Sequence, residues 1–130
     1  MVTLLLDSTQ LEVALSATER AMSFRRRNVT VAREHIVKVQ LTDDAWNWLR
    51  GVPRPGVLVP GVVAMGSWES AGGPDFVVVR RRRPSVVVDL EGDPEFHRLV
   101  LSTRHGLALV QALRLDVRDE PVDVVDIVGG

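Results

Sequence analysis

The stretch of sequence that decides the fold runs from residue 76 to residue 113 and reads FVVVRRRRPSVVVDLEGDPEFHRLVLSTRHGLALVQAL. Its first part contains three short apolar runs, at residues 76–81, 86–90 and 97–101. Pro84 and residues 91–94 separate these runs, and apolar runs of this length bounded by turn-forming residues predict β-strands. A helical pattern follows at residues 103–113, where leucine and valine recur at helical spacing. Strands therefore come first and one helix closes the series.

The residues before this stretch continue the pattern of short strands. Strands are predicted at residues 11–15, 20–26, 29–31, 37–41 and 61–68. Ser16 and Glu19 match the capping-box spacing, which predicts a single helical turn or tight bend. Residues 33–35 interrupt the valine alternation and predict a bend between two strands. Residues 43–60 contain prolines, glycines and two tryptophans without any period, so they are interpreted as a long loop or an irregular edge.

The order of these elements predicts a mainly β protein, in which the sheet curls on itself and the C-terminal helix at about 103–114 covers one open end. A chain of 130 residues has the length of one domain with a real core. We expect that domain to span residues 1–115, with its core at 10–115. Residues 116–130 form an acidic tail, in which an apolar segment after Pro121 could pair as an extra strand.

Charge and composition limit the classes of function. The net charge is −1, but residues 1–115 carry 15 basic against 12 acidic side chains, whereas residues 116–130 carry five acidic side chains against Arg118. Cysteine is absent, which excludes disulfides, thiolate nucleophiles and the usual zinc ligands. Residues 2–6 do not resemble a secretory signal, and no apolar run approaches the ~20 residues of a membrane span. A cytoplasmic protein without a transmembrane segment is the expectation.

The sequence offers little for catalysis. His35, His97 and His105 have no short-range spacing that would force them to converge on a metal, so isolated surface histidines are the simpler interpretation. Neither a glycine-rich phosphate loop nor a nucleophile elbow is present. We therefore expect no enzyme, no catalytic residue, no metal site and no cofactor. An enzyme would require Glu34 and His35 to converge in a pocket with residues 43–44.

Two arginine clusters are the candidates for anion binding. Their members are Arg25, Arg26 and Arg27 at one predicted turn, and Arg80, Arg81, Arg82 and Arg83 between two strands. If both turns opened at the same end of the sheet, they would form a face for phosphate groups or an acidic protein. The alternative is a solvated turn, because strand alternation would turn Arg80 and Arg82 away from their neighbours. Specific nucleic-acid recognition is not expected at a net charge near zero.

A tryptophan pair is the candidate for protein binding. Trp46 and Trp48 project to the same side if the chain is extended, and Pro53 and Pro55 follow closely. Such an apolar shelf with two indole donors is typical of residues that concentrate binding energy. The alternative is that the two indoles pack against the protein's own sheet or loop.

Several packing and turn positions resemble those of the bacterial pleckstrin-homology-like (PH-like) domains, most closely the small stand-alone actinobacterial versions. They comprise residues 11–16, Glu19, residues 29–31, Ile36 and Val39, the Pro55-Gly56 and Pro60-Gly61 steps, residues 66–68, Gly73, Phe76, and Leu101-Ser102 before the helix. The resemblance covers roughly residues 10–115 and implies a bent seven-stranded antiparallel barrel with a C-terminal helix over one end. It implies a binding scaffold and carries over no catalytic residue.

The sequence thus favours a non-enzymatic module that binds protein. Self-association through an exposed strand edge or through residues 122–128 belongs to the same hypothesis. The alternative is a site for an anionic ligand or lipid headgroup at the arginine clusters.

Overall fold

The computed structural model describes residues 2–119. Its elements, in chain order, are β1 (Thr3–Leu6), β2 (Gln10–Ala14), α1 (Ala17–Met22), β3 (Val29–Ala32), η1 (Arg33–His35), β4 (Ile36–Thr42), η2 (Ala45–Trp48), β5 (Val52–Val59), β6 (Val63–Ser70), β7 (Gly73–Arg80), β8 (Ser85–Leu90), β9 (Arg98–Ser102) and α2 (Gly106–Asp119). The two η elements are short 3₁₀ helices.

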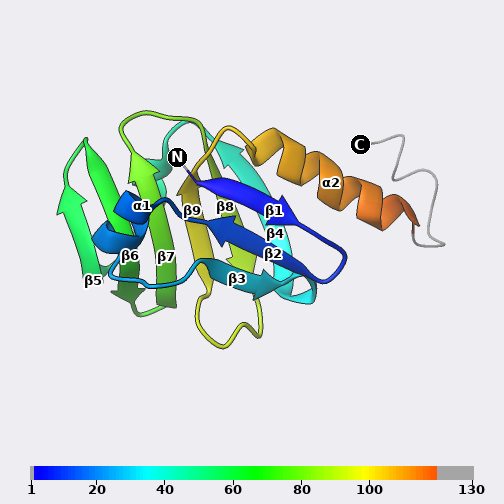
Figure 1. The fold of residues 1–130 in the computed structure, drawn as a ribbon, viewed down its shortest axis with the longest axis horizontal. Coiled ribbons are helices and arrows are strands. Elements are labelled where there is room, and N and C mark those ends of the chain that lie inside the picture. Colours follow the sequence, from blue (N-terminus) through cyan, green and yellow to red (C-terminus); the bar gives the residue numbers. More distant parts are fainter. Residues whose placement is uncertain (1, 120–130) are drawn as a thin grey trace.

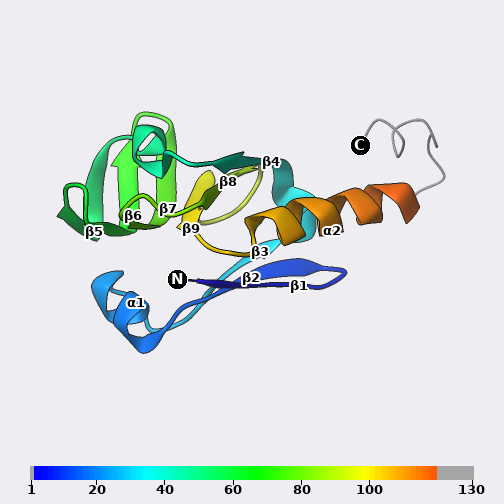
Figure 2. The ribbon, with the colours of Figure 1, turned by 90° about the horizontal axis from the view of Figure 1, so that it is seen from above.

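The strands form two sheets that lie face to face (Figures 1 and 2). One sheet has the order β1-β2-β3, and the other has the order β4-β8-β9-β7-β6-β5. Alternate side chains of both sheets point into the space between them, and Leu11, Val13, Phe76, Leu99 and Leu101 are fully buried there. Helix α1 contacts β6 and continues the layer of the smaller sheet over the far part of the larger one (Figure 2).

The outer face of the six-stranded sheet carries a second apolar cluster. Val77, Val79, Val87 and Val100 are buried on this face, and Trp46, Trp48 and Leu49 of the η2 segment pack over them. The central strands are therefore covered on both sides. This explains why residues 86–88 form an uninterrupted valine run instead of an alternating one.

The mainly β class and the helix near the C-terminus are confirmed, but the seven-stranded antiparallel barrel is wrong. The residues described include nine strands in two sheets, and these sheets do not close into a barrel. The sheet is also not wholly antiparallel, because β7 and β9 run parallel. The reason is that the β7–β8 turn carries the chain across the end of β9 instead of returning directly beside β7.

Two local predictions near the N-terminus differ from the structure. The strand predicted at residues 20–26 is wrong, because α1 ends at Met22 and turns follow it. The predicted capping box is confirmed: the Ser16 hydroxyl accepts the Glu19 N–H at 3.2 Å, and the Glu19 carboxylate accepts the Ser16 N–H at 2.8 Å. Strand β1 was not predicted, and its half-exposed residues carry no clear alternation of residue type.

The segment predicted as a long loop or an irregular edge contains both η2 and a strand. Strand β5 is the edge of the six-stranded sheet, so a structureless loop is wrong and an irregular edge is confirmed. Its pairing with β6 shifts between Pro53 and Gly56, and the Arg54–Pro55 peptide bond is cis. Proline lacks the N–H that a central strand needs, which fits these residues at an edge.

Helix α2 does not cover the open end of a barrel. It lies where the edge strands β1 and β4 of the two sheets come together, and it contacts both (Figures 1 and 2). Leu109 is buried there and Leu113 packs against the core, whereas Leu107 is exposed. The helix includes residues 116–119 of the predicted acidic tail, and residues 120–130, with the proposed extra strand, lie outside the described residues. No helix within residues 2–119 has the length and apolar character needed to span a bilayer.

Candidate functional site: an arginine groove

The turn that joins β7 to β8 is the structural centre of the candidate site. Strands β7 and β9 are parallel and β8 is antiparallel to β9, so Arg80, Ser85 and Ser102 meet at one end of the sheet. Residues 81–84 must pass over the end of β9 to connect two strands that are not neighbours. The four consecutive arginines 80–83 therefore lie at a crossover, at the edge of the sheet.

Buried hydroxyls fix this turn from below. The Arg80 N–H donates to Ser102 Oγ at 3.0 Å, and the hydroxyls of Ser85 and Ser102 lie 3.1 Å apart. The Ser85 hydroxyl also donates to the carbonyl oxygen of Arg83 at 3.0 Å. Both serines are buried, so these hydrogen bonds are shielded from water.

Neighbouring segments fix the turn from its sides. The Arg81 N–H donates to the Val62 carbonyl at 2.9 Å, and Trp46 Nε1–H donates to the Arg81 carbonyl at 2.7 Å. The Thr103 N–H donates to the Pro84 carbonyl at 3.1 Å. Arg81 has φ +45°, a left-handed conformation that non-glycine residues adopt only when their surroundings hold it. The backbone that carries the arginines is thus preorganised.

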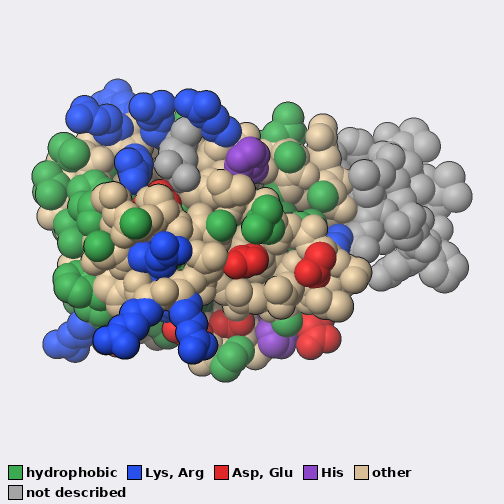
Figure 3. Space-filling model, viewed as in Figure 1, with side chains coloured by type: hydrophobic (Ala, Val, Ile, Leu, Met, Phe, Trp, Pro, Cys, Tyr) green, Lys and Arg blue, Asp and Glu red, His purple; other side chains and the backbone are tan. Residues whose placement is uncertain are grey.

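A groove of about 450 Å³ opens beside this turn, and we call it the arginine groove. Its lining residues are Thr18, Met22, Val62, Val63, Met65, Arg80, Arg81, Arg83 and Arg104. The guanidinium of Arg80 lies 3.5 Å from Oε2 of the buried Glu19 in α1, which compensates one of the four charges. Arg81, Arg83 and Arg104 are exposed. Figure 3 shows basic side chains gathered along the edge of the molecule where β7 ends.

The other lining side chains make the groove amphipathic. Met65 is buried, Met22 and Val63 are part-buried, and the Thr18 side chain is exposed at the margin. A ligand in this groove would therefore meet guanidinium groups and methyl or thioether groups together. Arginine pairs with carboxylate or phosphate through parallel N–H donors, and the apolar side chains offer contact area.

Two further hollows lie at the same end of the sheet. One, of about 630 Å³, is lined by Asp43, Asp44, Trp46, Leu58, Pro60, Gly61 and Arg82. The other, of about 550 Å³, lies between Leu41 and Leu107 and shares Arg104 with the arginine groove. The first places two carboxylates around Arg82, so Arg82 faces a mixed charge environment. Of these three hollows, the arginine groove has the most arginines and, within residues 2–119, no carboxylate in its lining.

Arg25, Arg26 and Arg27 do not join this site. Arg25 Nη1 donates to Glu95 Oε2 at 2.9 Å, and its guanidinium lies 5.6 Å from the ring centroids of both Phe76 and Phe96. Glu95 belongs to the β8–β9 loop, which lies at the opposite end of β8 from the arginine turn. Arg26 and Arg27 are exposed. The predicted single face of seven cations is therefore not formed.

The tryptophan pair lies against the protein's own sheet. Trp46 and Trp48 are part-buried in η2 and pack on the outer apolar cluster. Arg98 lies 5.3 Å from the Trp48 ring centroid and donates to Asp89 Oδ1 at 2.7 Å. Packing against the protein's own sheet therefore explains why both indoles are part-buried. Pro53 is part-buried and Pro55 is exposed on the edge strand β5, and a partner-binding role for all four residues stays a prediction.

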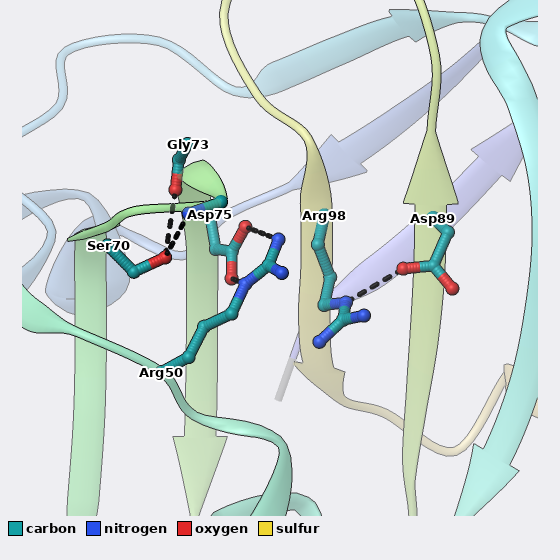
Figure 4. Close-up of polar contacts among 7 residues, drawn as sticks. Arg50, Ser70, Gly73, Asp75, Asp89 and Arg98 are labelled. Atoms are coloured by element: carbon teal, nitrogen blue, oxygen red, sulfur yellow. Dashed lines mark hydrogen bonds and ion pairs between the residues drawn. The ribbon is translucent and has the colours of Figure 1, made fainter.

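A second ion pair occupies the same face (Figure 4). Arg50 donates from Nε to Asp75 Oδ2 at 2.7 Å and from Nη2 to Asp75 Oδ1 at 2.9 Å. The hydrogen bonds to Asp75 raise the pKa of Arg50 above its usual value. Asp75 is almost fully buried, and both carboxylate oxygens are engaged, so this pair fastens the segment before β5 to β7.

The residues suggested for an enzyme do not form one pocket. Glu34 and His35 lie in η1 before β4, whereas Asp43 and Asp44 follow its other end, and seven residues of strand separate the two pairs. Among the described residues, no group of three or more His, Cys, Asp or Glu side chains is placed to hold a metal ion.

Sequence reasoning missed several residues of the arginine groove. Thr18, Met22 and Met65 reach it from α1 and β6, and Arg104 reaches it from the segment before α2. These residues are far apart in the sequence, and no local spacing marks them as neighbours. Ser85 and Ser102, which support the turn beside the groove, were easier to notice in the sequence, because each is a polar residue that directly adjoins an apolar run.

Comparisons with known proteins give no relative for this chain. No protein-family model matches it. No curated protein and no solved structure matches it either.

Proposed function

We propose that this protein is a non-catalytic binding module that holds an acidic segment of a partner protein in the arginine groove. The observation that carries the proposal is the convergence of Arg80, Arg81, Arg83 and Arg104 around an apolar floor, on a turn fixed by buried hydrogen bonds. A binding role is also what the resemblance to PH-like domains implies.

Charge supports an anionic ligand. Among the residues described, no aspartate or glutamate lines the groove, and Glu19 lies beneath it beside Arg80. Three exposed guanidinium groups close together repel one another, and an incoming anion relieves this repulsion. Each exposed ion pair contributes only about 0.2–1 kcal/mol, so binding depends on several guanidinium contacts made together with contact to the apolar floor.

The apolar floor favours a peptide over a free phosphate. Met22, Val63 and Met65 give contact area that an inorganic anion cannot use, whereas an acidic segment with aliphatic side chains can use both features. A turn with fixed backbone loses little conformational entropy on binding, which favours affinity.

The neighbouring carboxylates disfavour an anionic membrane. Asp43 and Asp44 line the hollow next to the arginine turn and are exposed. A flat anionic bilayer laid against this end of the sheet would approach them as well as the arginines. A peptide can lie in the groove alone and avoid this repulsion.

The test uses a synthetic peptide of alternating Asp and Val, with an Asn/Val peptide as its neutral counterpart, titrated by calorimetry. We expect binding of the acidic peptide that weakens about tenfold or more from ~0.05 to ~0.2 M salt. The double variant Arg83→Gln/Arg104→Gln should lose about fivefold or more in affinity, because it removes two ion pairs worth about 0.5–1 kcal/mol each.

The variant Arg26→Gln/Arg27→Gln is the matched control. It removes the same number of exposed cations at the other end of the sheet and should change the affinity by less than about twofold. Equal losses in both variants would show only nonspecific attraction. Sedimentation with anionic vesicles is the second arm, and binding to vesicles without binding to the peptide would replace this proposal by the lipid alternative.

A further inference from the structure

We infer that the acidic segment taken by the arginine groove is the chain's own residues 120–130, supplied by a second copy of the protein. This inference rests on the proposed function, because it names the occupant of the same groove. It requires three things: chemical fit, reach, and a reason for a second copy instead of the same molecule.

The chemistry of the segment fits the groove. Residues 120–130 read EPVDVVDIVGG, in which Glu120, Asp123 and Asp126 are interspersed with valine and isoleucine. This composition matches guanidinium groups around an apolar floor. The segment also concentrates negative charge, since residues 116–130 carry five acidic side chains against one arginine.

Helix α2 sets the reach of the segment. It begins two residues after Arg104, the groove residue nearest to it in the sequence, and runs to Asp119. Fourteen helical residues at 1.5 Å each separate the helix ends by roughly 20 Å. Figures 1 and 2 show that α2 runs away from the β5–β7 side of the molecule and extends beyond both sheets.

This geometry favours a second copy. A fully extended chain spans at most ~3.6 Å per residue, so Asp123 can lie no more than ~14 Å from Asp119. That is less than the length of α2, so Glu120 cannot return to Arg104 of the same molecule, and Asp123 could reach it only with the chain and both side chains fully extended. Asp126 reaches farther, at most ~25 Å from Asp119, but the three carboxylates cannot all enter the groove of their own molecule, whereas in a second copy they can enter it together.

The resulting assembly is head-to-tail. Each copy would offer one groove and one acidic segment at different places on its surface, so the contact is heterologous and adds further copies as concentration rises. Because the contact pairs exposed charges, salt should weaken it.

The experiment is sedimentation velocity on three full-length proteins at low salt. We expect the natural protein to associate with rising concentration. The neutral-segment variant, Glu120→Gln/Asp123→Asn/Asp126→Asn, and the groove variant, Arg83→Gln/Arg104→Gln, should each stay monomeric. The matched control is Glu34→Gln/Glu69→Gln/Glu91→Gln, which removes three exposed carboxylates elsewhere and should associate like the natural protein.

Mixing the two monomeric variants is the decisive arm. The neutral-segment variant keeps a working groove and the groove variant keeps a working segment, so an equimolar mixture should form complexes of two copies that cannot grow further. A natural protein that stays monomeric, or a mixture that forms no complex, overturns the inference.

A peptide titration separates this inference from the proposed function. A peptide of residues 120–130 should bind the neutral-segment variant at least about tenfold more tightly than its Gln/Asn counterpart. If the Asp/Val peptide binds and this peptide does not, the inference fails and the proposed function stands. If neither binds, both fail.

Discussion

The hydroxyls of Ser85 and Ser102 lie 3.1 Å apart beneath the turn that carries the arginines. Ser85 begins β8 and Ser102 ends β9, so this contact joins the two strands at the point where the chain crosses between them. Because Ser102 Oγ also accepts the Arg80 N–H, one buried oxygen organises both sides of the turn. The arginine groove therefore depends on a side chain that no ligand would touch.

Replacing Ser102 by alanine should destabilise the protein and weaken anion binding. The change leaves the Arg80 N–H without its hydroxyl acceptor in a part-buried site, at a cost of about 1–3 kcal/mol. Urea unfolding gives the free energy of unfolding, and calorimetry with the acidic peptide gives the affinity. Ser67→Ala, on a part-buried residue of β6, is the control. Unchanged stability and affinity in Ser102→Ala would contradict the role assigned to this hydroxyl.

Replacing Arg50 by methionine should destabilise the protein by about 2 kcal/mol, because it leaves the buried carboxylate of Asp75 without its guanidinium partner. The double variant Arg50→Met/Asp75→Asn removes that charge and should recover part of the loss. The free energy of unfolding in urea measures both effects. A double variant less stable than Arg50→Met would show that the buried charge is not the cause.

Gly51 and Gly61 form a matched pair for separating backbone strain from steric exclusion. Both have left-handed φ values, +81° and +76°. An added Cβ at Gly51 would lie 1.8 Å from the Glu69 carbonyl oxygen, whereas at Gly61 it would meet nothing within 4 Å. Gly61→Ala should cost about 1–2 kcal/mol for the left-handed conformation, and Gly51→Ala clearly more. Equal losses of thermal stability in the two variants would refute the steric argument.

Asp7 should contribute a pH-dependent part of the stability. Its Oδ1 accepts the N–H groups of Thr9 at 2.7 Å and Gln10 at 2.8 Å, and these bonds lower the pKa of Asp7 in the folded state. The ionised carboxylate therefore stabilises the fold above the unfolded pKa of about 3.9, and this contribution is lost as the pH falls through the lower folded value.

The variant Asp7→Asn measures this contribution. It should be less stable than the natural protein at pH ~6, and the difference should shrink as the pH falls below ~4. Urea unfolding across this range gives the comparison. A difference that stays constant with pH would show that the hydrogen bonds, and not the charge, matter at this turn.

The sequence predicted most of the strands because their boundaries are marked locally. Pro84, Gly92 and Pro94 end apolar runs, and the observed β8 and β9 follow them closely. The pairing of strands is different, because it depends on contacts far apart in the chain. Nothing near residues 81–84 reveals that they cross β9, so one curled sheet was predicted where two stacked sheets are found.

The candidate site likewise has a part that is marked locally in the sequence and a part that depends on contacts far apart in the chain. The arginine run was visible in the sequence, but its partners were not. Arg104 and Met65 join it only because β6, β7 and β9 end or begin at the same edge of the sheet. Conversely, Arg25 was grouped with the run by residue type alone, and its pairing with Glu95 removes it.

The position of β9 bears on how the chain acquires its structure. Among residues 2–119 it is the last strand made during synthesis, yet it lies between β8 and β7 in the middle of the larger sheet. Until it is in place, β4-β8 and β7-β6-β5 are two separate pieces with exposed apolar edges. A nascent chain therefore cannot complete this core in stages from the N-terminus, and the core can close only after residues 98–102 have left the ribosome.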